Sequence, residues 1–176
     1  NLLLFMSGVA CLGVGGGVFD STFNNYLSDV FNLGEAARGF LEFPRELPGF
    51  LTALFAGLLF FVPETRIAAF SSLAIGAGMI GLAFCGNNWY LMLVLMTLWS
   101  TGTHLLMPVR SSIVMELSHA GRKGARLGQM ASIGTAASIA GCVIVWVVMD
   151  RTAANYRLTF LIGGCVALCA AIAQFA

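Results

Sequence analysis

The sequence predicts an all-α integral membrane protein, one bundle of six transmembrane helices over residues 1–176. Three observations support this: 59% of the residues are hydrophobic, only 10% are charged, and the apolar residues gather into six long runs. A soluble domain carries about 25% charged residues, and a helix needs roughly 20 apolar residues to cross the hydrocarbon core. The formal net charge of +1 offers nucleic acid no basic face. Composition therefore disfavours a soluble enzyme and a nucleic-acid-binding protein.

The first three runs are each bounded by polar or turn-forming residues. Residues 2–26 form an apolar stretch that stops at the polar segment SDVFNLGEAAR. Residues 39–62 form the second run, which ends at the segment PETR, and residues 67–85 form the third, which ends at the turn GNN. Each run is long enough for one membrane span.

The last three runs follow the same pattern. Residues 89–107 begin at an aromatic pair, and the helical pattern can continue to Leu117. Residues 127–149 follow a basic loop, and residues 158–176 form the last run. The chain opens on Asn1 inside an apolar run and stops inside another, so we expect it to be a portion of a longer protein.

Basic residues predict the orientation, because Lys and Arg are enriched in cytoplasmic loops. Five of them fall on the side of the loop between spans four and five, and three on the other side: Arg66, Arg110, Arg122, Lys123 and Arg126 against Arg38, Arg151 and Arg157. We therefore expect a plasma-membrane protein with both termini in the cytoplasm. Aromatic residues expected at the outer interface favour the same orientation: Tyr26, Trp89, Tyr90, Trp146 and Tyr156.

Polar residues inside the spans predict a water-accessible cavity. Spans three and six contain no charged residue, whereas spans one, two and four carry nearly all the intramembrane polar groups. A charge at mid-membrane costs about 2.5–3.5 kcal/mol on insertion scales, so such residues are candidates for function. At 100° per residue, each polar set continues into small residues on one helical face. The candidates for solute contact or proton coupling are Asp20, Asn24, Glu42, Arg45, Glu46 and His104.

The densest candidate is the segment from Glu42 to Glu46 in span two. Glu42 can reach Arg45 and Glu46 at i+3 and i+4 spacing. One carboxylate could then exchange a proton while Arg45 keeps the other ionised. The alternative is that Pro44 starts the helix, since proline is favoured at the first helical position, which would leave Glu42 in a loop.

The other candidates also have two readings each. Asp20 is either a functional acid or a packing residue that hydrogen-bonds a neighbouring helix or pairs with Arg45. Asn24, with Asn25, either contacts a polar solute or ends the first helix, and we favour the second. His104 either shuttles protons or packs as a neutral side chain.

Three residues near the cytoplasmic side form a candidate conformational latch: Glu64, Arg66 and Arg110. Arg110 could reach Glu64 or extend its charged end to the interface. No catalytic or phosphate-binding motif is visible, so we expect no enzyme. The five cysteines, an odd number without CxxC spacing, suit neither a zinc site nor a disulfide framework. We expect no cofactor and no metal.

The loop RKGARLG, at residues 122–128, is followed by Gly134 and Gly141 in a helix rich in small residues. This pattern resembles the entry to the fifth helix of major facilitator superfamily transporters, and the six-span layout and short outer turn are similar to that family. The resemblance covers all 176 residues. It implies the N-terminal half of a twelve-helix transporter, built from inverted three-helix repeats and partnered by a C-terminal six-helix half of the same polypeptide. Helices one, two, four and five of the family contribute to the cavity and interface.

The chain departs from the family in the loop between spans two and three. The usual Gly-x-x-x-Asp-Arg-x-Gly-Arg-Arg pattern is reduced here to Glu64 and Arg66. The resemblance implies a secondary active transporter that moves a small solute by alternating access, driven by a proton or solute gradient. The alternatives are a non-transporting membrane receptor or sensor and an assembly subunit with the same fold. The expected partners are a small-molecule substrate, protons and the lipid bilayer.

Overall fold

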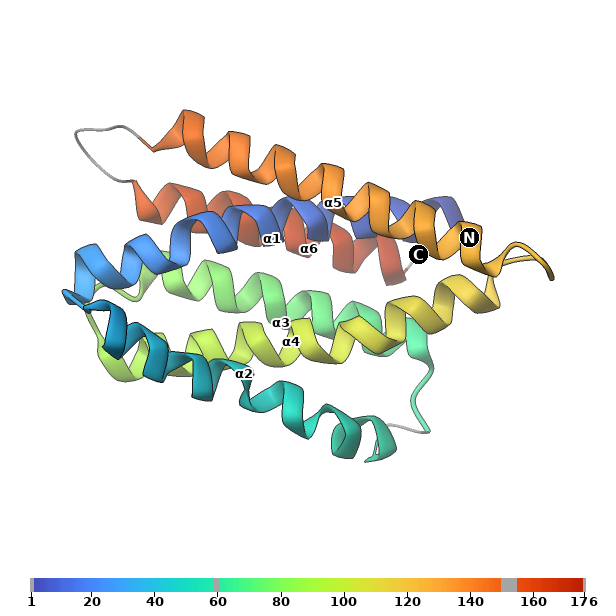
Figure 1. Cartoon of the computed structure of the whole chain (residues 1–176), viewed down its shortest axis with the longest axis horizontal. Helices are drawn as coiled ribbons and strands as arrows, with labels where there is room; N and C mark the ends of the chain where they lie inside the picture. The colour runs from blue at the N-terminus through green and yellow to red at the C-terminus, as the bar shows by residue number, and fades with distance from the viewer. Residues whose placement is uncertain (1, 59–60, 150–154, 176) are drawn as a thin grey trace.

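The computed structural model describes residues 2–58, 61–149 and 155–175. Within these residues the chain forms six α-helices and no strand (Figure 1). In chain order they are α1 (Leu2–Phe31), α2 (Glu35–Leu58), α3 (Glu64–Phe84), α4 (Trp89–Glu116), α5 (Lys123–Val148) and α6 (Tyr156–Phe175). The predicted all-α class is therefore confirmed, and each predicted run lies largely within one helix.

Helix α1 is longer than the sequence predicted. It passes through Asn24 and Asn25 and continues to Phe31, so the interpretation that these asparagines end the helix is wrong. The Asn25 side chain instead donates a hydrogen bond to the carbonyl of Ser21, one turn back, at 3.4 Å. The helix stops at Asn32, which adopts a left-handed φ of 53°. Asparagine is one of the few residues that tolerate this conformation, which explains why the chain turns here.

Helix α2 also starts earlier than predicted. It begins at Glu35 and runs through Pro44 and Pro48, so the interpretation in which Pro44 starts the helix is wrong. Each proline removes one backbone hydrogen bond from the helix. One turn after Pro48, the Thr52 hydroxyl donates a hydrogen bond to the Pro48 carbonyl at 3.0 Å. Residues 59 and 60, near the end of the expected span, lie outside the described residues.

Successive helices run in opposite directions along the bundle. Helices α1, α3 and α5 start at one end, and α2, α4 and α6 start at the other (Figure 1). The turn from α3 to α4 is tight because Gly86 adopts a positive φ of 59° and the Asn88 side chain accepts a hydrogen bond from the backbone of Leu91. Arg151, expected at the same end, lies outside the described residues.

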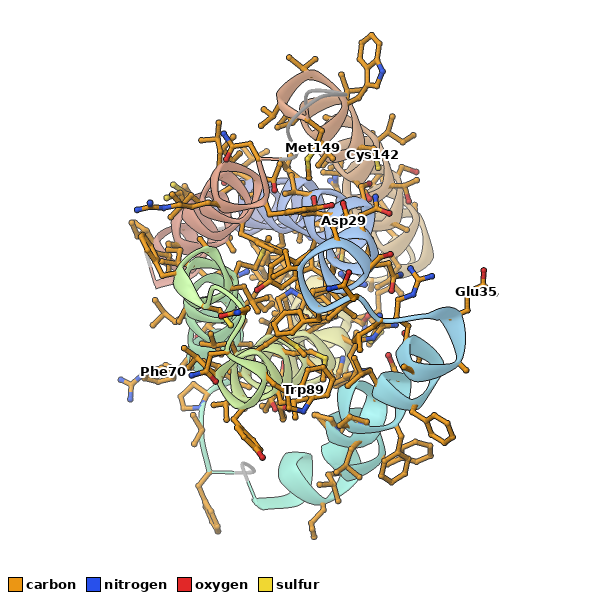
Figure 2. The ribbon with its side chains drawn as sticks, turned by 90° about the vertical axis from the view of Figure 1, so that its left-hand side faces the viewer. Asp29, Glu35, Phe70, Trp89, Cys142 and Met149 are labelled. Carbon is orange, nitrogen blue, oxygen red and sulfur yellow. The ribbon has the colours of Figure 1, made fainter. Side chains whose placement is uncertain are left out.

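Packing divides the bundle into two groups of three helices. Helix α1 packs against α5 and α6, while α4 packs against α3 and α2, and the close pair α3 and α6 joins the two groups. Viewed end-on, α2 lies at the edge of the bundle beside α4, and α5 lies at the opposite edge beside α1 (Figure 2). Helices α3 and α6, whose predicted spans contain no charged residue, thus contact each other, while α2 and α5 are the peripheral helices.

Aromatic side chains fill the core near one end of the bundle. Phe19, Phe23 and Phe160 are at most 2% exposed. The Phe19 ring stacks on Trp99 of α4 with centroids 3.6 Å apart. Tyr26 meets Tyr156 edge-on at 5.5 Å, so two of the aromatic residues expected at one interface do lie together.

Glycines let α1 and α5 approach closely. A Cβ atom on Gly13 would lie 2.6 Å from the backbone oxygen of Gly134, and one on Gly17 would lie 2.0 Å from that of Ser138. On the α5 side, a Cβ on Gly141 would lie 2.3 Å from the oxygen of Val14. Small residues commonly allow such contacts between membrane helices. The small-residue stripe predicted on the first span is therefore a helix-packing surface.

By length and composition, five helices in the described part of the chain are apolar enough to cross a membrane: α1, α3, α4, α5 and residues Tyr156–Gln174 of α6. Helix α2 is not among them, because any stretch of it long enough to span contains Glu42, Arg45 and Glu46. The composition of five helices therefore supports a membrane protein, and α2 is set apart by its charges.

Candidate functional site

Three of the five charged residues of α2 lie close together, and one of them contacts a histidine of α4. The Arg45 guanidinium contacts the Glu42 carboxylate at 2.5 Å and the Glu46 carboxylate at 3.3 Å. The other Glu46 oxygen lies 3.3 Å from His104 Nε2. We call Glu42, Arg45, Glu46 and His104 the charge cluster. The structure brings together four of the six residues predicted as site candidates.

Two features bring α4 close enough to α2 for this contact. A Cβ atom on Gly49 would lie 2.9 Å from the His104 ring, so only glycine leaves room for the imidazole there. Four residues before His104, the Ser100 hydroxyl donates a hydrogen bond to the backbone carbonyl of Arg45. The polar face predicted on span four is therefore partly a contact surface for α2.

The arrangement suits proton exchange. Glu46 lies between a permanent cation, Arg45, and a side chain that can be neutral or protonated, His104. The His104 side chain is 19% exposed and that of Glu46 is 46% exposed, so the imidazole is the more enclosed of the two. A proton gained at His104 would turn its contact with Glu46 into an ion pair, and loss of that proton would weaken the link between α4 and α2.

Asp20 lies apart from the charge cluster. It lines a cavity of about 440 Å³ between α1, α4 and α5, together with Arg110 and the Trp99 side chain. In the described residues the ion pairs of Arg45 are with Glu42 and Glu46. The expected alternative of a direct Asp20–Arg45 ion pair is therefore not what the structure shows.

Asn24 lies one turn beyond Asp20, and its side chain is exposed. Its backbone carbonyl accepts a hydrogen bond from the Arg38 guanidinium at 3.3 Å, which links the end of α1 to α2. A contact between the Asn24 side chain and a solute stays a prediction.

The latch residues do not meet one another in the described parts of the chain. Glu64 accepts a hydrogen bond from the Ser112 hydroxyl of α4 at 2.8 Å, and its second carboxylate oxygen is buried without a hydrogen-bond partner. Arg110 lies in the cavity with Asp20, and Arg66 is exposed. The expected Glu64–Arg110 contact is replaced by a Glu64–Ser112 link. Sequence reasoning missed Ser112, which is uncharged and was not among the candidate residues.

The family resemblance implied that the fifth helix contributes to the cavity, but no residue of α5 was among the predicted site residues. Thr135 and Ser138 of α5 line it opposite Thr103 of α4. The sequence of α5 is rich in small residues, which indicate helix packing. Thr135 and Ser138 are uncharged, so they were not selected as candidates.

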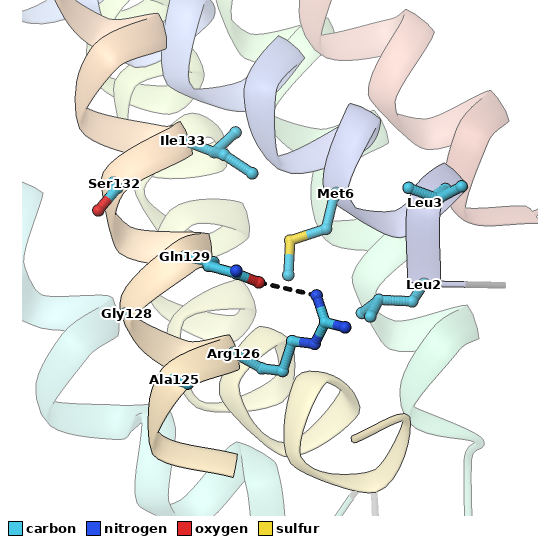
Figure 3. Close-up of a pocket in the computed structure, with 9 residues that line it drawn as sticks. All are labelled: Leu2, Leu3, Met6, Ala125, Arg126, Gly128, Gln129, Ser132 and Ile133. Atoms are coloured by element: carbon cyan, nitrogen blue, oxygen red, sulfur yellow. Dashed lines mark hydrogen bonds between the residues drawn. The ribbon is translucent and has the colours of Figure 1, made fainter. Parts of the chain in front are cut away.

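A second cavity, of about 640 Å³, lies between the first turns of α1 and α5 (Figure 3). Leu2, Leu3 and Met6 line one side of it, and residues 125–133 line the other. Its charged side chain, Arg126, donates a hydrogen bond to Gln129 at 2.8 Å. Because this charge already has a partner, the cavity with Asp20 and Arg110 is the better candidate for polar ligand binding.

Comparison with protein-family models gives no match for this chain, and comparison with curated proteins gives none either. Among the residues that the structure describes, no group of three or more His, Cys, Asp or Glu side chains could hold a metal ion. The geometry of the charge cluster and of the cavity is therefore the basis for a functional proposal.

Proposed function

We propose that this chain forms the N-terminal half of a secondary transporter of the major facilitator type, which moves a small solute through the plasma membrane by alternating access. The observation that carries the proposal is the charge cluster. Ionisable residues inside a membrane bundle are costly and mark ion or substrate pathways. Here three of them are held on a proline-containing helix against a histidine that can change its charge.

The helix contacts support the proposed repeat architecture. Exchanging the first three helices with the last three maps the strong contacts onto one another: α1 with α5 onto α4 with α2, and α1 with α6 onto α4 with α3. The α3–α6 contact maps onto itself. Inverted repeats of this kind allow a half-transporter to rock as a unit about a site near the bilayer midplane.

The exposed side chains support the proposed second half. Helix α5 is the least buried of the five apolar helices, and Ile139, Val143 and Trp146 are more than half exposed. Helix α2 exposes Phe40, Phe43 and Phe50. Lipid can cover part of these surfaces, and a C-terminal six-helix half would cover the remainder. In this proposal α2 crosses the membrane together with the five apolar helices, which gives six spans, and both termini face the cytoplasm.

The experiment is gradient-driven accumulation by the natural polypeptide in liposomes. The external solution holds a defined mixture of amino acids, organic acids, amines, sugars and nucleosides, and the liposome contents are measured by mass spectrometry under an imposed pH gradient. We expect one solute class to accumulate with the wild-type protein and not with Glu46→Gln or after addition of a protonophore. Glu35→Gln, at an exposed position at the start of α2, is the matched control.

Absence of accumulation for every solute would refute transport. Binding of a solute without accumulation or counterflow would instead support the alternative of a receptor or sensor. If accumulation persists both in Glu46→Gln and after addition of the protonophore, the protein is a transporter whose driving force does not depend on the charge cluster.

A further inference from the structure

The cavity between α1, α4 and α5 has opposite charges at its two ends. Asp20 of α1 and Arg110 of α4 both line it. In the described residues neither side chain takes part in an ion pair or hydrogen bond, and the Nε atom of Arg110 is buried without a partner. The Asp20 side chain is exposed and Arg110 is half-buried, so both charges are open to a ligand, and each favours a ligand group of opposite sign.

The two charged side chains extend toward each other along the cavity. The Phe19–Trp99 stack, with ring centroids 3.6 Å apart, places Trp99 of α4 near the level of Asp20, the next residue on α1. Arg110 follows Trp99 by eleven residues on α4, which is about 16 Å along the helix axis. Helical side chains lean toward the N-terminus of their own helix, and α1 and α4 run in opposite directions. Asp20 and Arg110 therefore both lean into the space between them.

The wall between these ends carries no other charged side chain among the lining residues. Trp99 and Leu106 supply apolar surface, Gly16 leaves space, and Thr103 and Ser138 supply hydroxyls. The volume of about 440 Å³ lies in the range of small-molecule sites. A ligand with a short, weakly polar chain between its two charged groups matches this wall.

We propose that this cavity binds a small zwitterion, with its cationic group at Asp20 and its anionic group at Arg110, so that the charge-to-charge spacing of the ligand decides affinity. The inference rests on the proposed transport function, for which it names the substrate class. A ligand with both charges satisfies both ends at once, whereas a simple anion or cation leaves one charge of the cavity unpaired. A zwitterion also has no net charge, which lowers the cost of its passage through the membrane interior.

The test measures binding of five probes to the natural polypeptide in lipid nanodiscs by titration calorimetry. Glycine, 4-aminobutyrate and 6-aminohexanoate vary the charge spacing, and hexylamine and hexanoate each remove one charge. We expect a longer zwitterion to bind at least tenfold more tightly than glycine, hexylamine or hexanoate. Equal affinities for all five probes, or binding of none of them, would overturn the proposal.

Variants at the two ends sharpen the test. Asp20→Asn should reduce zwitterion affinity to that of hexanoate, and Arg110→Gln should reduce it to that of hexylamine. Arg110→Lys keeps the charge and should retain most of the affinity, which separates loss of charge from loss of folding. Arg122→Gln, at an exposed loop position, should bind as the wild type does. Unchanged zwitterion preference in both Asp20→Asn and Arg110→Gln would refute the assignment.

Counterflow of labelled 6-aminohexanoate separates this inference from the proposed function. Zwitterion binding without counterflow would support the cavity assignment and refute transport. If the protein accumulates another solute but binds none of the five probes, transport is supported and the proposal that the cavity binds a zwitterion is refuted.

Discussion

Replacing Gly17 with alanine tests whether α1 and α5 are held together by direct backbone contact. The added Cβ would lie 2.0 Å from the backbone oxygen of Ser138, far inside the ordinary contact distance of 3.4–4 Å. Because the obstructing atom belongs to a helix backbone, it cannot rotate away, and the helices must separate by more than an ångström. Forcing an extra methyl group into a packed interior typically costs about 1–3 kcal/mol.

The neighbouring residue provides a matched control. A Cβ on Gly16 would meet nothing within 4 Å, although Gly16 lies on the same helix one position earlier. Alanine there removes a glycine from a helix interior, which typically stabilises a helix by about 1 kcal/mol. Both variants gain this helix propensity, so it cancels between them, and their unfolding free energies should differ by the cost of the clash alone, about 1–3 kcal/mol.

The assay is thermal unfolding of the purified protein in one detergent, followed by size-exclusion chromatography of the folded fraction. We expect Gly17→Ala to melt several degrees below the wild type and Gly16→Ala to melt at or above it. If Gly17→Ala is as stable as Gly16→Ala, then α1 and α5 do not pack at these glycines, and the placement of the cavity between α1, α4 and α5 also fails.

Three further predictions use the described geometry. Glu46→Gln should abolish gradient-driven accumulation while its melting temperature stays within a few degrees of the wild type, and normal accumulation would remove Glu46 from the coupling role. Burial raises the pKa of the Cys85 thiol in the α3–α4 turn, so a smaller thiolate fraction is present at any given pH. Iodoacetamide should therefore modify Cys85 more slowly in the native protein than in detergent-denatured protein at pH 8, with the cysteines at the other positions replaced by alanine. Equal rates would contradict this. Asn88→Ala removes the side chain that caps α4 and should lower the unfolding free energy by about 1 kcal/mol, measured by thermal unfolding. The adjacent exposed Asn87→Ala is its control, and equal melting of the two variants would contradict the capping role.

Hydrophobic runs were sufficient to predict the helices, because a membrane helix needs a minimum apolar length and six such runs are present. The hydrophobic runs could not predict at which residue each helix begins or ends. Asn24 and Asn25 look like a helix end because asparagine favours caps and turns. In the structure α1 continues past them, and its last turns pack through Tyr26 and Leu27 into the core. Such tertiary contacts outweigh local preference, and a single sequence does not display them.

The candidate site was predicted where spacing within one helix decides the contact. The i+3 spacing of Glu42 and Arg45 predicts their contact, and Arg45 also contacts the adjacent Glu46. Contacts between helices depend on how each helix is rotated about its axis and how far it is shifted along the bundle. The periodicity of a single sequence determines neither. His104 faces Glu46 because Gly49 admits its ring, and Arg110 faces the cavity of Asp20 instead of Glu64.

The charges of α2 are paired, which a count of charges along the sequence does not reveal. Hydropathy adds the cost of Glu42, Arg45 and Glu46 as if each were isolated in hydrocarbon. In the structure the Arg45 guanidinium contacts both carboxylates, and His104 of α4 offers Glu46 a second partner. Mutual pairing lowers the cost of these charges inside a bundle. The Glu42–Arg45 pair depends on α2 being helical through Pro44, and the Glu46–His104 contact depends on α2 being packed on α4. The charges that set α2 apart from the other five helices thus hold it to α4, and a change of charge at His104 alters that same contact.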